Sequence, residues 1–148
     1  LLLVKFGATW CPWCATLQRA MDGPELFGRK GDGLDLAKSL HHIEIGLSMI
    51  HKGRKAEIPS GEAVLALVLK SAPDVKIRAI PFIAVVDPNN PARVFARNID
   101  DVARKDGTHD LARVRQVFTD AHSFVTGNAT APSEPGWLKR KWLRWWYG

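Results

Sequence analysis

Residues 9–14 have the sequence Thr9-Trp10-Cys11-Pro12-Trp13-Cys14 and contain both cysteines of the 148-residue chain, in C-x-x-C spacing. A short apolar run over residues 1–6 precedes them and predicts a buried strand. After them, Trp13, Leu17 and Met21 recur at helical spacing, which predicts a helix. A C-x-x-C pair between a strand and a helix favours redox chemistry over half of a zinc site.

The predicted helix places Cys11 at its N-cap and Pro12 at its first position, where a proline loses no hydrogen bond. A thiol at the N-cap faces unpaired backbone N–H groups and the positive end of the helix dipole, which favour the thiolate. Such positions lower a cysteine pKa from about 8.5 to roughly 3.5–7.5. Cys14 follows one turn later, so we expect Cys11 to attack and Cys14 to resolve the mixed disulfide. Trp10 and Trp13 would flank the sulfurs with apolar surface.

Residues 4–14 resemble the active-site strand and turn of the thioredoxin superfamily. Residues 76–87 are similar to the family's segment in which a cis-proline precedes a central strand and faces the C-x-x-C. The resemblance implies a thioredoxin-like α/β fold, with a central mixed sheet flanked by helices. Here the fold would carry insertions between the C-x-x-C helix and the cis-proline strand, and a C-terminal tail rich in Trp and basic residues.

The resemblance also implies that Ile80-Pro81 is a cis bond, with Pro81 beside Cys11 and the backbone of Ile80 open to a substrate peptide. The residues expected to bind substrate are Trp10, Pro12, Trp13, Ile80 and Pro81. A leading strand and helix, which the family has, would precede Leu1.

Lys5 occupies a position where the family often has a buried acidic residue that helps to move the proton of the resolving thiol. A lysine favours a thiolate electrostatically, but it cannot accept a proton while it is charged. Two interpretations of Lys5 stay open. It modulates the cysteine pKa, or it is an ordinary strand lysine whose side chain reaches solvent.

The remaining pattern predicts one domain over residues 1–126. The C-x-x-C helix should end at residues 22–24, because Asp-Gly-Pro is a strong breaker. In chain order we then expect a surface loop over 24–38 that leads into a short helix from about residue 32, a strand over 39–47, a basic loop over 49–60, a helix over 60–71, a strand over 80–86, a turn over 87–91, an edge strand over 93–98, and a helix over 108–125 capped by Thr108 or Asp110.

Composition is that of an ordinary globular domain, with 46% hydrophobic and 24% charged residues. No apolar run approaches the roughly 18 residues that a transmembrane helix needs. The net charge is +6, but residues 133–148 hold four cations and one acid, so the body is only mildly basic and nucleic-acid binding is not expected. The five histidines have no metal-ligand spacing with the cysteines, so we expect surface or satisfied histidines and no metal.

Residues 127–136 have the composition of a linker, and residues 137–148 form a tail with four of the six tryptophans. Three settings suit such a tail: a groove on a partner protein, the surface of a membrane, or its own domain. The residues expected to anchor it are Trp137, Trp142, Trp145, Trp146, Arg140 and Arg144. We also expect a periplasmic or other non-cytosolic location, in association with a membrane surface.

These observations lead to two functional hypotheses. The first is a thiol–disulfide oxidoreductase that exchanges disulfides with protein thiols through Cys11 and Cys14 and needs no bound cofactor. Glutathione-dependent exchange is less favoured, since no Gly-Gly follows Ile80-Pro81. The second is a thioredoxin-like accessory or assembly subunit of a larger, membrane-bound complex, with redox activity secondary or absent. An inert structural cysteine pair is the plainest alternative.

Overall fold

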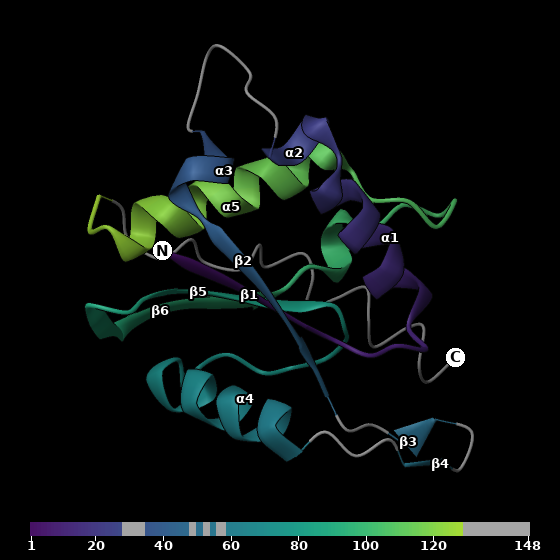
Figure 1. Ribbon diagram of the computed structural model, residues 1–148, viewed down its shortest axis with the longest axis horizontal. Helices are drawn as coiled ribbons and strands as arrows, with labels where there is room; N and C mark the ends of the chain where they lie inside the picture. The colour runs from purple at the N-terminus through teal and green to yellow at the C-terminus, as the bar shows by residue number, and fades with distance from the viewer. Residues whose placement is uncertain (28–34, 48–49, 52–53, 56–58, 129–148) are drawn as a thin grey trace.

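A four-stranded mixed sheet lies at the centre of the protein (Figure 1). The computed structural model describes residues 1–27, 35–47, 50–51, 54–55 and 59–128. The strand order is β2-β1-β5-β6, with β1 parallel to β2 and antiparallel to β5, and β6 antiparallel to β5. The strands are β1 (Leu2–Gly7), β2 (His41–Gly46), β5 (Phe82–Asp87) and β6 (Asn90–Asn98). The predicted α/β class is confirmed, as is the position of β6 at an edge.

Helices cover both faces of the sheet (Figure 1). One face carries α1 (Pro12–Asp22) and α5 (Leu111–Val125), and the other carries α4 (Pro59–Ser71). Both faces of β1 are therefore buried, which explains why residues 1–6 form a nearly continuous apolar run. Leu3 and Phe118 belong to the core under α1 and α5, whereas Phe6 and Phe82 belong to the core under α4.

The segment between α1 and β5 contains more regular structure than we predicted. A short helix, α2 (Pro24–Phe27), lies where we expected a surface loop. The short helix predicted from about residue 32 is α3 (Leu36–Ser39), which starts later than expected. Leu26 of α2 is fully buried, so tertiary packing holds a helix that its length alone would not. Asp35 caps α3 by accepting from the backbone N–H of Lys38, which fixes its start after residue 32.

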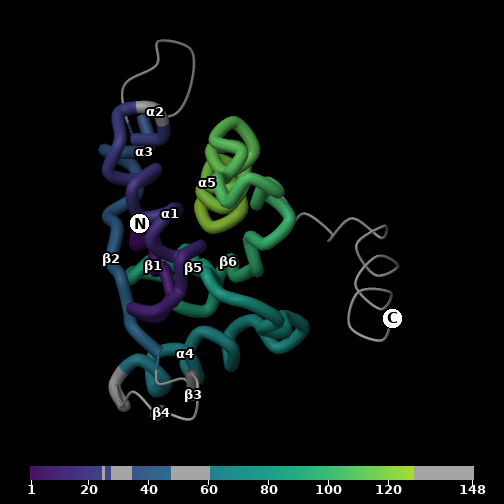
Figure 2. The backbone as a smooth tube through the Cα atoms, turned by 90° about the vertical axis from the view of Figure 1, so that its right-hand side faces the viewer, coloured from purple at the N-terminus to yellow at the C-terminus, as the bar shows by residue number. Residues whose placement is uncertain are grey.

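The predicted basic loop over 49–60 is also partly wrong. It contains a small antiparallel sheet, β3 (Ile50–His51) and β4 (Arg54–Lys55), which lies on the α4 side of the main sheet (Figure 2). Further bounds differ from the prediction, and β5 for example starts at Phe82 and not at residue 80. β2 starts at His41, β6 extends back to Asn90, and α5 starts at Leu111 with Asp110 as its N-cap.

The C-terminal end of α5 is capped by the two residues that follow Thr126. Gly127 has a φ of +86°, and its N–H bonds the carbonyl of Phe124, while the N–H of Asn128 bonds the carbonyl of Ser123. Residues 129–148, with most of the predicted linker and the whole predicted tail, lie outside the described residues. Within the described part of the chain, no helix is both long and apolar enough to span a membrane.

Candidate functional site

Cys11 and Cys14 lie at the start of α1, with their sulfur atoms within disulfide-bonding distance. Cys11 is the N-cap, with extended backbone, and Pro12 occupies the first helical position. The backbone N–H of Cys14 donates to Sγ of Cys11 at 3.2 Å, so the cap hydrogen bond is made by the sulfur itself. The predicted cap geometry is confirmed. Both cysteines are nearly buried, at 4% and 2% exposure.

The peptide bond between Ile80 and Pro81 is cis, as predicted. Sγ of Cys11 lies 3.8 Å from the carbonyl oxygen of Ile80. The fold thus brings together two segments that are 69 residues apart in the sequence. Pro81 is buried and Ile80 is half-buried. The sulfur of Cys11 therefore faces a backbone carbonyl at the point where the chain enters β5.

Asn98 holds the backbone that leads to this cis bond, and the sequence reasoning missed it. Its side-chain oxygen accepts from the N–H groups of Arg78 (2.9 Å) and Ala79 (3.2 Å), and its Nδ2 donates to the carbonyl of Lys76 (2.7 Å). The side chain is 2% exposed, at the end of β6. The only signal for it in the sequence was a polar residue at the end of the predicted strand over 93–98.

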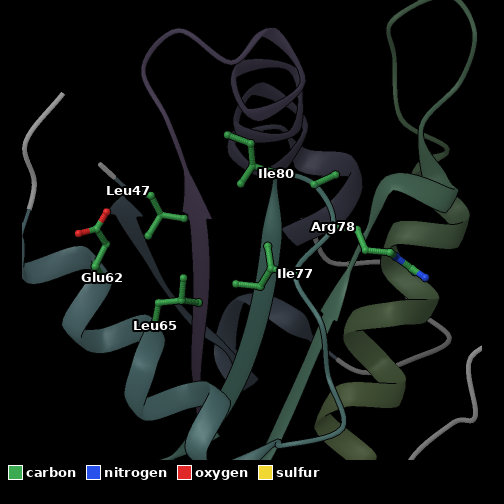
Figure 3. A pocket seen from close by; sticks show the side chains of 7 residues that line it. Leu47, Glu62, Leu65, Ile77, Arg78 and Ile80 are labelled. Atoms are coloured by element: carbon green, nitrogen blue, oxygen red, sulfur yellow. The ribbon is translucent and has the colours of Figure 1, made fainter. Parts of the chain in front are cut away.

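A cavity of about 300 Å³ opens beside Ile80, between α4 and the strands (Figure 3). Figure 3 shows Leu47, Leu65 and Ile77 pointing toward one another across it, with Glu62 at its edge. The lining is therefore mainly apolar, with a carboxylate at one side. Ile80 thus borders this cavity and also contacts the sulfur of Cys11.

Lys5 is fully buried, so the interpretation in which its side chain reaches solvent is wrong. Its Nζ lies 2.9 Å from a carboxylate oxygen of Glu44 and donates to Oε1 of Gln18 at 2.6 Å and to the carbonyl of Cys14 at 3.4 Å. β1 and β2 pair Lys5 directly with Glu44. Three acceptors compensate for burying the ammonium group, and one of them belongs to the C-x-x-C segment.

The histidines were predicted to be exposed or, if buried, hydrogen-bonded, and two of them are neither. His109 is 4% exposed and packs edge-on against Trp13, with ring centroids 5.9 Å apart. Among the described residues, its Nδ1 and the Nε2 of His42 are buried without a hydrogen-bond partner. Burial lowers the pKa of His109, and burial together with nearby Lys5 lowers the pKa of His42. Burial therefore disfavours protonation of both rings.

We expect the free energy of unfolding to fall as the pH drops below the ordinary histidine value of 6.5. The pKa values of His109 and His42 are lower in the folded state than in the unfolded chain, so below pH 6.5 the unfolded chain binds more protons. The contribution of these histidines to the free energy of unfolding is therefore complete above pH 6.5 and is lost below it. Each histidine contributes at most about 1.4 kcal/mol per pH unit. Urea titrations of the wild type, His109→Gln and the exposed-site control His41→Gln across this range measure the slope. An equal slope in His109→Gln would contradict the assignment.

The structure thus brings Cys11, Cys14, Ile80 and Pro81 together, and it places Lys5 behind Cys14. Pro12 is exposed, and Trp10 and Trp13 are half-buried at the same end of α1. The predicted tail anchors lie outside the described residues. Within those residues, no group of three or more His, Cys, Asp or Glu side chains is placed to hold a metal ion. No family model, curated protein or solved structure matches this chain.

Proposed function

We propose that the protein is a thiol–disulfide oxidoreductase that exchanges disulfides with protein thiols through Cys11 and Cys14. The observation that carries the proposal is the position of Cys11 Sγ, at a helix N-cap and 3.8 Å from the carbonyl of Ile80 in a cis Ile80-Pro81 bond. Such a cap stabilises a thiolate, which is the nucleophile in disulfide exchange. The order and directions of the strands are compatible with a thioredoxin-like fold, which adds support.

The reaction needs no bound cofactor, because the two cysteines exchange two electrons with the partner. The Cys11 thiolate attacks one sulfur of a partner disulfide, and the other partner sulfur leaves as a thiolate. Cys14 then attacks Sγ of Cys11, so that the Cys11–Cys14 disulfide forms and the partner leaves fully reduced. The same steps in reverse oxidise a partner dithiol.

The surface in front of Cys11 suits an extended peptide as partner. The carbonyl of Ile80 is available beside the sulfur, and the apolar cavity begins next to it. A peptide that lies along Ile80 would place an apolar side chain between Leu65 and Ile77. Backbone pairing and one side-chain pocket would then hold a partner cysteine at the attacking sulfur.

Redox equilibration tests this function. We expect the Cys11–Cys14 pair to open and close in glutathione buffers, with a midpoint in the range of roughly −270 to −120 mV that C-x-x-C proteins span. Trapping free thiols at each buffer potential measures the midpoint, and Cys14→Ser, which cannot form the pair, provides the baseline. A pair that stays closed in strongly reducing buffer, or that never closes, would contradict the proposal.

The composition of residues 137–148 favours a second role, as an accessory subunit anchored to a complex or a membrane surface. Trp and Arg are typical anchors at protein interfaces, and Trp beside cations suits a lipid headgroup layer. We expect removal of residues 137–148 to release the protein from the bound fraction without changing disulfide exchange. Replacing the four tail tryptophans with alanine, while keeping the cations, is the matched variant. Unchanged fractionation after the deletion would rule the anchor out.

A further inference from the structure

Cys14 must lose a proton before it can attack, but its surroundings offer that proton no direct route to water. The side chain is 2% exposed. The ammonium of Lys5 donates to the Cys14 carbonyl and cannot accept a proton while it is charged. The resolving step therefore needs an acceptor that reaches the buried sulfur and also contacts solvent.

Glu44 meets both requirements. A β-carbon placed on Gly7 would lie 3.1 Å from Sγ of Cys14 and 3.9 Å from Oε1 of Glu44. The sulfur and the carboxylate oxygen thus face one small space above Gly7 and are at most 7.0 Å apart, the sum of those two distances. Absence of a side chain at Gly7 keeps this space open, so a water there can bridge the sulfur and the carboxylate oxygen.

The carboxylate is also held in place and in contact with solvent. Lys5 fixes it through the 2.9 Å ion pair, and 49% of the Glu44 side chain is exposed. The titratable groups that act on neighbouring His42 include, besides Lys5 and Glu44, His41 on β2 and Asp22 on α1, which accepts from Gln18 at 2.8 Å. Neither these two nor His42 has a described contact with the space between Gly7 and Cys14, so Glu44 is the group best placed for the proton.

We propose that Glu44 accepts the proton of Cys14 in the resolving step, and that Lys5 is its positioning residue. This inference rests on the proposed disulfide exchange. In the mixed disulfide, the Cys14 thiol passes its proton to Glu44 through water. The Cys14 sulfur forms a bond to Sγ of Cys11, the bond from Cys11 to the partner breaks, and the partner sulfur leaves with the electron pair. Glu44 then releases the proton to solvent on its exposed side.

The aromatic disulfide 5,5′-dithiobis(2-nitrobenzoate) isolates this step. The reduced protein releases one coloured thiolate when Cys11 attacks and a second when Cys14 resolves, so a stopped-flow trace separates the two rates. We expect Glu44→Gln to slow the second phase about 100-fold, as for loss of a general base, and to leave the first unchanged. Glutamine keeps an oxygen for Lys5, and Asp22→Asn, a carboxylate lost nearby, should change neither phase.

The direction of the effect distinguishes proton transfer from simple electrostatics. Removing a negative charge beside Cys14 favours its thiolate, so a purely electrostatic role predicts a faster second phase in Glu44→Gln. A proton acceptor predicts a slower second phase whose rate keeps rising with pH as hydroxide takes over. Added acetate should restore the second phase in Glu44→Ala, and Glu44→Asp, which keeps the carboxylate, should be intermediate.

The same experiment distinguishes failure of the proposed disulfide exchange from failure of the proposed role of Glu44. A wild-type protein that releases no second thiolate would overturn the disulfide exchange itself, and the role of Glu44 with it. A wild-type protein that releases both, together with a Glu44→Gln variant whose second phase is as fast or faster, would overturn the role of Glu44 alone.

Discussion

Replacing Cys11 with serine is expected to reduce disulfide exchange to the uncatalysed background while the protein stays folded. A serine hydroxyl is not ionised at neutral pH, so the attacking nucleophile at the start of α1 is lost. The fold should survive because serine is among the best N-cap residues and can accept the N–H of Cys14 as the sulfur does. Turnover of a disulfide-bonded peptide, together with a thermal unfolding curve, measures both parts.

Cys14→Ser is the matched variant for this experiment. It keeps the attacking sulfur but removes the resolving one, so we expect a stable mixed disulfide with the peptide in place of turnover. The variant would therefore also trap protein partners. Turnover that persists in Cys11→Ser would show that the chemistry does not pass through this sulfur.

The Lys5–Glu44 ion pair should respond unequally to removal of its two members. Lys5→Met replaces a fully buried ammonium by an apolar chain of similar length, and half-exposed Glu44 can return to water. We expect this variant to be as stable as the wild type or more stable by about 1 kcal/mol. Glu44→Ala leaves the buried ammonium with Gln18 and the Cys14 carbonyl but no counter-charge, which should cost about 2 kcal/mol.

Urea denaturation of both variants with the disulfide closed measures this difference, since opening the disulfide would itself alter stability. A loss of about 2 kcal/mol is smaller than the stability of a typical domain, so Glu44→Ala should remain folded for kinetic work. The ranking is the critical result. If Lys5→Met were the less stable of the two, the ion pair would be a net contributor to the fold.

The parts of the site that depend on local sequence could be predicted. Cys11 and Pro12 are adjacent to the strand and helix that position them, and cap preferences act within one turn. The strand predicted over 39–47 likewise corresponds to β2. The Ile80-Pro81 cis bond could be predicted only from the family resemblance, because no local rule selects the cis isomer for a particular proline.

The parts that depend on register and packing could not be predicted. Lys5 was ambiguous because its partner Glu44 lies directly opposite on β2, and the nearly continuous apolar run around Lys5 has no alternation that would indicate this register. His109 precedes the cap of α5 and meets Trp13 only because α5 packs near the start of α1. α2 has only four residues, too few to form a stable helix by themselves. Burial of Leu26 in the hydrophobic core stabilises it.

The three hydrogen bonds of Asn98 have a consequence for the thermodynamics of partner binding. They tie the backbone before Pro81 to the end of β6, so the carbonyl of Ile80 belongs to the framework of the sheet and not to an independent loop. The conformational entropy of ordering residues 76–79 has therefore been lost during folding. A peptide that lies along Ile80 gives up only its own freedom, which leaves more of the contact energy as net affinity.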